Sequence, residues 1–166
     1  MIPRVGIGYD VHRFGAGRAF VLGGVAIPHA QGLVGHSDAD ALAHAVADAL
    51  LGALALGDLG AHFPDTDPRW AGASSLDLLR RVVALVQGAG HGVGNVDATV
   101  LCAMPRLAPH VPAMREALAG ALGLPVERVS VKATRPEGIG SLAHGEGLAV
   151  WAVALVVPAP DHGEKK

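Results

Sequence analysis

The sequence predicts an α+β fold, a single-domain sandwich in which a mixed β-sheet packs against helices. Strand-like segments occur both in pairs and singly between helix-like segments, without the regular alternation of a doubly wound sheet. A length of 166 residues, 51% of them apolar, suits one domain with a substantial core. Glycine and proline are scattered, so no linker divides the chain. We expect residues 1–157 to form the domain and residues 158–166 to be a flexible tail.

Composition and charge exclude several classes of function. The chain has 13 basic and 15 acidic side chains and a formal net charge of −2, so it lacks a basic field for nucleic acid or an anionic membrane. Its longest apolar run, Leu148–Val157, is too short to span a bilayer as a helix. The single cysteine, Cys102, excludes an intrachain disulfide and a multi-cysteine zinc site, and we expect it in the core. Residues 1–10 lack the features of a signal or transit peptide, so we expect a cytoplasmic protein.

The first third of the chain predicts two strands and a helix. Arg4–Val11 alternates weakly between apolar and polar residues, and Phe20–Ile27 has β-branched residues around a glycine pair, so the two strands could form a hairpin. The pattern then changes, because apolar residues recur at intervals of three and four over the following segment. Ser37 and Asp40 have the spacing of a capping box that starts this helix, and Gly57 can end it.

The rest of the chain predicts a loop followed by helices and strands. Asp58–Ser75 is rich in X-Pro steps and aspartates, which is typical of an ordered surface loop. Ser74 or Ser75 can cap the next helix. The remaining expected elements are that helix to about Gly88, a strand over Val93–Ala103, a helix over Pro112–Leu122, and strands over Val129–Ala133 and Leu148–Val157.

Three residues on two different elements could hold one metal ion. Asp10 and His12 are two apart in a predicted strand, so both side chains point to the same face. The predicted helix offers a third ligand from the stripe Asp40, His44 and Asp48, whose members are spaced by four. An Asp–His–His set would leave an open fourth position on zinc, as in catalytic zinc sites. The Asp-x-His spacing is also common in turns and surface pairs, so the residues alone leave both interpretations open.

Two further segments could bind phosphate or a second metal. Unpaired N–H groups at the amino end of the predicted helix favour an anion, and His36 and Ser37 could add donors there, although Ser37 could equally serve only as a cap. Lys132–Glu137 combines two cations, a hydroxyl and a carboxylate, which suits a phosphate chain bridged by Mg²⁺. Asp65 and Asp67 could bind a cation or a polyol, although such aspartates more often stabilise turns.

Taken together, the motifs of the chain resemble those of one enzyme family, in the same order from about Arg4 to Val157. The matching segments are Gly8-Tyr9-Asp10-Val11-His12, Leu22-Gly23-Gly24-Val25, Gly35-His36-Ser37-Asp38-Ala39-Asp40 leading to His44, Asp48-Ala49-Leu50-Leu51-Gly52-Ala53, Gly57-Asp58-Leu59-Gly60, Phe63-Pro64-Asp65-Thr66-Asp67-Pro68, Gly94-Asn95-Val96-Asp97, Lys132-Ala133-Thr134 and Gly145-Glu146-Gly147. The chain is therefore similar to the 2-C-methyl-D-erythritol 2,4-cyclodiphosphate synthases, enzymes of the non-mevalonate isoprenoid pathway.

The resemblance implies a reaction, its metals and an assembly. In the family, the 2-phosphate of 4-diphosphocytidyl-2-C-methyl-D-erythritol 2-phosphate attacks the β-phosphorus, which expels CMP and closes a cyclic diphosphate. By similarity, Asp10, His12 and His44 hold one Zn²⁺ per subunit, and Glu137 holds Mg²⁺ or Mn²⁺ on the substrate diphosphate. The family is a homotrimer with active sites between subunits. The expected partners are thus a cytidine diphosphate substrate and two further copies of the chain.

The resemblance also assigns the other site residues. His36, Lys132 and Arg135 are expected to be catalytic, and Asp48 is expected to orient a ligand histidine or its loop. Residues 102–108 are expected to hold cytosine largely through backbone groups. The full expected substrate-binding set is Asp10, His12, His36, Ser37, Asp58, Leu59, Gly60, Phe63, Pro64, Asp65, Thr66, Asp67, Cys102, Ala103, Met104, Pro105, Arg106, Leu107, Ala108, Thr134, Arg135, Pro136, Glu137 and His144.

The chain departs from the family pattern in one region. Arg135 stands where the family commonly has a second hydroxyl, so a guanidinium replaces that donor. His144 stands where some members have an arginine that helps to bind an isoprenoid diphosphate at the trimer axis. Such a ligand would here meet a side chain whose charge depends on pH.

Two other functions fit the predicted metal ligands. A zinc phosphohydrolase would attack phosphate with a metal-bound water. A non-catalytic trimeric protein would use the metal as a structural clip, but structural zinc usually has four protein ligands rather than three. The cyclase therefore remains the favoured interpretation, on the strength of the resemblance.

Overall fold

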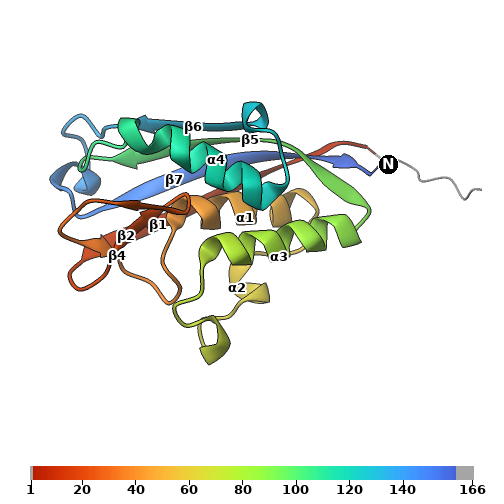
Figure 1. Ribbon diagram of the computed structural model, residues 1–166, viewed down its shortest axis with the longest axis horizontal. Helices are drawn as coiled ribbons and strands as arrows, with labels where there is room; N and C mark the ends of the chain where they lie inside the picture. The colour runs from red at the N-terminus through yellow and green to blue at the C-terminus, as the bar shows by residue number, and fades with distance from the viewer. Residues whose placement is uncertain (1, 160–166) are drawn as a thin grey trace, which may run out of the picture.

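The protein is built on a five-stranded β-sheet with its helices packed on one face (Figure 1). The computed structural model describes residues 2–159. The elements are β1 (Arg4–Gly15), β2 (Phe20–Leu22), β3 (Val25–Ile27), β4 (Gly32–Leu33), α1 (Ala41–Ala53), α2 (Leu59–His62), α3 (Ser75–Gly88), β5 (His91–Cys102), α4 (Val111–Leu122), β6 (Val129–Thr134) and β7 (Gly147–Pro158), with 3₁₀ turns at Pro68–Trp70, Ala108–His110, Val126–Arg128 and Ser141–His144. Among these helices, none has both the length and the apolar character needed to cross a membrane.

The main sheet is mixed, as predicted. Its strand order is β4-β1-β7-β5-β6, and its neighbours are antiparallel except for β5 and β6, which run parallel. β7 lies at the centre and pairs with both β1 and β5, which explains why it contains the longest apolar run of the sequence. The predicted α+β class is confirmed, with a small second sheet formed by β2 and β3.

α1 is the central helix, because it lies between the sheet and α3 (Figure 1). Ten of its 13 residues are buried, and six of these are alanines. A helix that is apolar on almost every side belongs in a core. Any side chain that α1 presents to a site is therefore held in a fixed place.

The backbones of α1 and β1 lie unusually close together at two glycines of β1. A Cβ atom on Gly6 would lie 2.0 Å from the carbonyl oxygen of Ala49, and one on Gly8 would lie 1.9 Å from that of Ala45. No side chain fits at either position, because the obstacle is helix backbone. These glycines let β1 and α1 share residues in one site.

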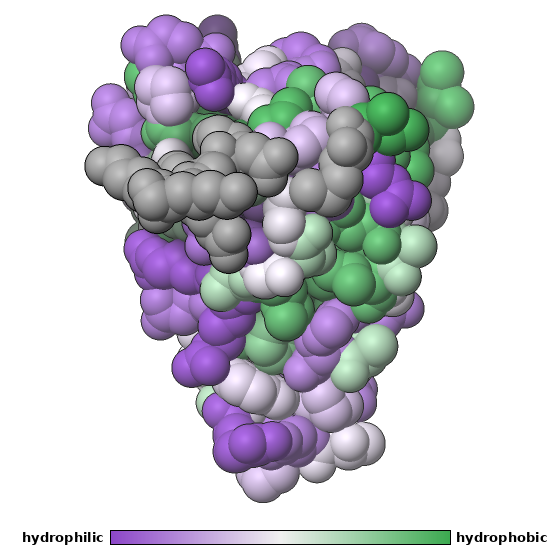
Figure 2. All heavy atoms as spheres, turned by 90° about the vertical axis from the view of Figure 1, so that its right-hand side faces the viewer, coloured by the Kyte–Doolittle hydropathy of each residue, from purple (hydrophilic) through white to green (hydrophobic). Residues whose placement is uncertain are grey.

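The opposite face of the sheet carries exposed hydrophobic side chains. We call the following residues of β1 and β7 the open sheet face: Val5, Ile7, Tyr9, Val11, Trp151 and Val153. Ile7 is 68% exposed and pairs across the strands with Val153, and the rings of Tyr9 and Trp151 lie 5.2 Å apart. Hydrophobic residues also gather in a green band on the end of the molecule seen in Figure 2. An apolar surface of this kind is typical of a protein–protein contact.

The predicted hairpin between the first two strand segments is wrong. Phe20–Ile27 is divided into β2 and β3, which pair with each other, whereas β1 pairs with β4 and β7. The turn consists of Gly23 and Gly24, with φ angles of +57° and +75°. Two positive φ angles in succession close a tight two-residue hairpin, so the glycine pair forms a turn within the segment.

Both predicted ends of α1 also need correction. Asp40 is the N-cap residue, and its side chain accepts hydrogen bonds from the N–H groups of Leu42 and Ala43. Ala39 has a φ of +59°, which breaks any helical continuation from Ser37, so the capping box is wrong. At the other end α1 stops at Ala53, before Gly57, because Ala55 itself adopts the left-handed conformation with a φ of +56°.

Two segments are more regular than predicted. The loop over Asp58–Ser75 contains α2 and the 3₁₀ turn Pro68–Trp70. Pro158 belongs to β7, and the N–H group of Ala159 donates to the carbonyl of Gly90 at 2.9 Å, so the expected flexible tail does not begin at residue 158. Residues 160–166 of that predicted tail lie outside the described residues.

Candidate functional site

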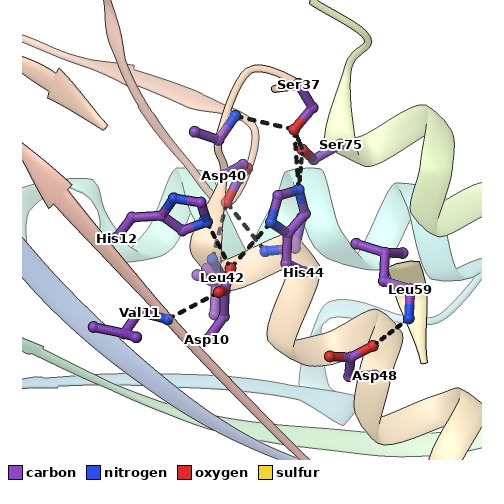
Figure 3. A network of polar contacts seen from close by, with 12 residues as sticks. Asp10, Val11, His12, Ser37, Asp40, Leu42, His44, Asp48, Leu59 and Ser75 are labelled. Carbon is purple, nitrogen blue, oxygen red and sulfur yellow. Dashed lines mark hydrogen bonds and ion pairs between the residues drawn. The ribbon is translucent and has the colours of Figure 1, made fainter. Parts of the chain in front are cut away.

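The structure brings Asp10, His12 and His44 together, as predicted (Figure 3). The carboxylate oxygen Oδ2 of Asp10 lies 3.0 Å from Nε2 of His12 and 3.0 Å from Nδ1 of His44. One potential ligand atom from each residue lies within 4.8 Å of the others. Two of these residues alternate along β1 and the third lies on the buried helix α1, so two rigid elements fix the cluster.

The ring orientations suit metal binding. The Nδ1 group of His12 donates to the carbonyl oxygen of Val34 at 2.7 Å, so Nε2, the nitrogen that faces Asp10, is the one available as a metal ligand. His44 is oriented in the opposite sense, because its Nδ1 faces Asp10 while its Nε2 lies 2.8 Å from the hydroxyl of Ser75. In metal sites the second ring nitrogen usually has such a partner. One carboxylate oxygen and two imidazole nitrogens form a donor set that fits Zn²⁺ and related divalent metals.

The cluster also perturbs the ionisation of its members. Burial alone would raise the pKa of Asp10, but the hydrogen bonds and charges of His12 and His44 hold this pKa well below its usual range. Burial opposes protonation of His12, and the hydrogen bond and charge of Asp10 outweigh it, so the pKa of His12 is raised. A metal ion would displace a proton from this imidazole, so metal binding is expected to weaken as the pH falls.

A cavity of about 490 Å³ opens beside the cluster, and we call it the metal-side cavity. This volume is within the usual range for small-molecule sites. Its lining residues are Asp10, His12, His36, Ser37, His44, Leu59, Gly60, Phe63, Pro64, Asp65, Trp70 and Leu78. The sequence interpretation missed Trp70 and Leu78 but placed the other members at the substrate or metal site. Asp58, Thr66 and Asp67 do not line the cavity.

Three aspartates form contacts that hold the segment bordering this cavity. Asp48 accepts a hydrogen bond from the N–H group of Leu59 at 2.7 Å, so it holds the start of α2 rather than a ligand histidine. Asp58 caps α2 by accepting from the N–H group of Ala61 at 2.9 Å. Asp67 binds Arg69 and starts a 3₁₀ turn, in agreement with the turn interpretation of that residue.

The prediction of an anion site at free N–H groups of the helix start is wrong for Leu42 and Ala43. Asp40 already occupies these two N–H groups and also accepts from Gly23 and Gly24. Ser37 is only 7% exposed. His36 is exposed beside the cavity, with its Nε2 3.4 Å from the carbonyl oxygen of Asp67.

A second cavity of about 510 Å³ lies where the parallel strands β5 and β6 end. Its lining residues are Cys102, Pro105, Arg106, Leu107, Ala108, Ala133, Thr134, Arg135 and Glu137. The segments expected to hold the base and the phosphates therefore converge. Ala103, Met104 and Pro136 lie around an adjoining hollow of about 320 Å³ that shares Arg135 and Glu137.

Two further predicted site residues, Lys132 and His144, lie apart from the cavity linings. Lys132 lies on the outer face of β6 and pairs with Asp97 at 2.6 Å. His144 ends a 3₁₀ turn, and neither residue lines a described cavity. Cys102 is buried in the core, as predicted, and burial raises the pKa of its thiol to about 11.

The metal-side cavity and the second cavity share no lining residue among the described residues. The first depends on β1 and α1, whereas the second lies at the ends of β5 and β6, with β7 between them in the sheet. Within one chain the two cavities are therefore separate.

Arg18 is a supporting residue that the sequence interpretation missed. Its guanidinium donates to the carbonyl oxygens of Gly35 and Ser37 and so holds the loop that carries His36. A planar donor fork can bridge two carbonyls in this way. No local pattern marks this arginine, because its partners lie 17 and 19 residues away.

Comparison with known proteins identifies the family. The profile of the YgbB family matches residues 3–157. The chain belongs to this family. A relative from Ectopseudomonas mendocina is 58% identical over 94% of this chain and 99% of its own length, and one from Salinibacter ruber is 60% identical over 94% and 99%. Both relatives are named 2-C-methyl-D-erythritol 2,4-cyclodiphosphate synthase.

Solved structures of YgbB-like proteins have the same fold. The bifunctional IspDF from Campylobacter jejuni matches with a TM-score of 0.89 and 40% identity, over 93% of this chain and 42% of that longer chain. A CDP complex of IspF from Plasmodium falciparum matches with a TM-score of 0.82 and 28% identity, over 95% of this chain and 97% of that one. A 2C-methyl-D-erythritol-2,4-cyclodiphosphate synthase in its CDP-bound form is 38% identical, with a TM-score of 0.85, over 93% of this chain and 100% of that one.

Proposed function

We propose that this chain converts 4-diphosphocytidyl-2-C-methyl-D-erythritol 2-phosphate to 2-C-methyl-D-erythritol 2,4-cyclodiphosphate and CMP. An oxygen of the 2-phosphate forms a bond to the β-phosphorus while the bond from that phosphorus to the CMP oxygen breaks. CMP is the leaving group, and no water is consumed. The observation that carries the proposal is the Asp10–His12–His44 cluster, in a chain 56–60% identical to synthases of this activity.

The reaction requires positioning and charge stabilisation more than proton transfer. The attacking phosphate oxygen is already an anion, so a strong general base is unnecessary. The protein must bend a flexible molecule into a ring and stabilise the charge on its phosphates. His36, exposed beside the metal-side cavity, and Arg135, which lines the second cavity, are suited to bind phosphate oxygens.

Two metal sites fit the residues present. Asp10, His12 and His44 would hold Zn²⁺ with one position open, because each imidazole directs one nitrogen to the cluster and has a partner for the other. Glu137 borders two adjoining hollows and would bind Mg²⁺ or Mn²⁺ together with substrate phosphates. When bound, these ions supply electrostatic stabilisation of phosphate charge.

The second cavity is the proposed cytidine site. Its volume suits a nucleoside, and it is formed largely by the segment Cys102–Ala108. Two related structures contain CDP, which supports a cytidine nucleotide as part of the substrate. Thr134 and Arg135 at the end of β6 would then face the phosphates.

A homotrimer is the proposed assembly. The open sheet face presents hydrophobic side chains that another copy of the chain could cover. The two cavities of one chain are separate, so a second subunit could supply the cytidine site to the metal-side cavity of the first. Lys132 and its partner Asp97 lie on the same outer side of the sheet and would be brought toward this contact.

Placing a charge on the open sheet face is expected to disrupt the assembly. The Ile7→Lys substitution would bury an unpaired ammonium group at a subunit contact, which costs several kcal/mol. Analytical ultracentrifugation should show the wild-type protein at three times the chain mass of 16.8 kDa and the variant at a lower mass. The matched control is Leu85→Lys on α3, at a side chain that is 38% exposed and outside the open sheet face. A wild-type monomer, or a trimeric Ile7→Lys variant, would contradict this assignment.

The function itself is tested by product analysis. ³¹P NMR of the purified protein with Zn²⁺, Mg²⁺ and the proposed substrate should show two cyclic-diphosphate resonances together with CMP. Release of inorganic phosphate would instead indicate the phosphohydrolase. A folded trimer that binds Zn²⁺ and gives no turnover would reject the cyclase. The described relatives are synthases, and neither the hydrolase nor the non-catalytic protein gains support from them.

A further inference from the structure

The hydroxyl of Ser75 lies between His44, toward which it points in Figure 3, and the carboxylate of Asp38. Its Oγ is 2.8 Å from Nε2 of His44 and forms a hydrogen bond with Oδ1 of Asp38. Oδ2 of the same carboxylate accepts from the N–H group of Ser75 at 3.0 Å. Ser75 is 1% exposed, so its hydroxyl depends on these two partners.

The chemistry of the groups determines which one donates in the hydrogen bonds from His44 to Ser75 and from Ser75 to Asp38. A carboxylate only accepts, so the Ser75 hydroxyl donates its proton to Asp38. The Ser75 oxygen is then free to accept from Nε2–H of His44. The neutral imidazole that a metal ion requires then keeps its proton on Nε2 and has its lone pair on Nδ1, the nitrogen that faces Asp10.

We propose that Ser75 and Asp38 are positioning residues that hold the His44 ring with Nδ1 available as a metal ligand. This inference deepens the proposed function and rests on its metal site. Asp38 polarises the serine hydroxyl, which in turn accepts the imidazole proton. The lone pair on Nδ1 becomes more basic, and the ring is held at the angle that the cluster requires.

Ser37 does not provide the same support. Its Oγ lies 3.2 Å from Nε2 of His44, farther than that of Ser75, and it already accepts from the N–H group of Ala39. It lies 3.4 Å from the Ser75 hydroxyl. Ser75 has both the shorter contact to His44 and the direct link to a carboxylate.

The chain of contacts also joins three separate segments of the fold. His44 belongs to α1, Asp38 to the loop before it, and Ser75 is the first residue of α3. Ser74, the N-cap residue of α3, makes no side-chain capping bond, so the Asp38 carboxylate binds the start of α3 instead. The ring position of His44 is thereby linked to the position of α3.

The test is the Zn²⁺ affinity of the metal-free full-length protein, measured by competition with a chromogenic chelator. Ser75→Ala is expected to weaken Zn²⁺ binding by about 10- to 100-fold, the usual effect of removing the partner of a ligand histidine. The matched control is Ser74→Ala, which removes an exposed hydroxyl next to Ser75 that caps nothing and should keep the wild-type affinity. Wild-type affinity in folded Ser75→Ala would overturn the proposal.

A spectroscopic readout separates positioning from a general loss of structure. In the zinc-loaded wild-type protein, ¹⁵N–¹H NMR should detect the Nε2 proton of His44 protected from exchange, and Ser75→Ala should lose this protection. If Ser75→Ala does not fold, the second variant is Asp38→Asn, which keeps the shape of the side chain and is also expected to weaken Zn²⁺ binding. Unchanged Zn²⁺ affinity in Asp38→Asn would reject the proposal that Ser75 and Asp38 position His44. Failure of the wild-type protein to bind Zn²⁺ would instead reject the metal site of the proposed function.

Discussion

Replacing His44 with alanine is expected to abolish turnover while the fold is kept. The substitution removes one of three ligand atoms and leaves only Asp10 and His12 in the cluster. Loss of metal-based charge stabilisation costs several kcal/mol, which corresponds to a rate decrease of roughly a thousandfold or more. Alanine is the best helix former, and six buried alanines already occupy α1, so the helix should tolerate the change. The measurements are CMP release, zinc content of the purified protein and circular dichroism.

The matched control is His29→Ala. His29 is an exposed imidazole outside the metal-side cavity, where its Nδ1 contacts the carbonyl oxygen of Gln31. This variant should retain zinc and turnover. Wild-type turnover by a folded His44→Ala protein would show that the cluster is not catalytic. The structural-clip alternative would be favoured over the cyclase if His44→Ala is unfolded even with zinc, while the wild-type protein unfolds on removal of zinc and refolds when zinc is restored.

The sequence could predict Asp10 and His12 as a pair because their spacing is local, whereas His44 lies 34 residues from Asp10 and was one of three candidates on the helix until the resemblance selected it. The two-residue period of a strand places Asp10 and His12 on one face, and a helix that follows can supply His44. The supporting contacts are not local. Ser75 lies 31 residues from His44, and Arg18 lies 17 residues from Gly35, so neither contact leaves a pattern in the sequence. The role of Asp40 was missed for a similar reason, since its carboxylate also binds the glycine turn between β2 and β3.

The sequence predicted which segments are helices and which are strands better than it predicted which strands pair with each other. Hydrophobic periodicity identified the major helices and strands, because burial imposes a period of two or of about four residues. The hairpin was wrong because periodicity does not reveal which strand is the neighbour. One overlooked signal was Gly6-x-Gly8 in β1 together with the alanines of α1 spaced by four, Ala45, Ala49 and Ala53. Small residues with these two periods indicate a strand and a helix in backbone contact.

Substituting Gly8 with alanine is therefore expected to damage both the fold and the site. The new Cβ would lie 1.9 Å from the carbonyl oxygen of Ala45 and 2.8 Å from the backbone nitrogen of Ala49. Both obstacles are helix backbone, so α1 as a whole must move away from β1. Overpacking in a core typically costs about 1–3 kcal/mol, and a clash with backbone should reach or exceed the upper value. Urea denaturation of the metal-free protein measures this loss.

The same displacement should weaken metal binding, because His44 immediately precedes Ala45 whereas Asp10 and His12 remain on β1. The matched control is Gly52→Ala, a glycine of α1 whose Cβ would have its nearest neighbour at 3.8 Å. That change should stabilise the protein by a few tenths to about 1 kcal/mol, since alanine is favoured over glycine inside a helix. If Gly8→Ala matched the wild type in urea and in zinc affinity, the close contact between β1 and α1 would not be what aligns the three ligands. If stability alone fell, the ligands would be held together by their own hydrogen bonds rather than by the packing of helix on strand.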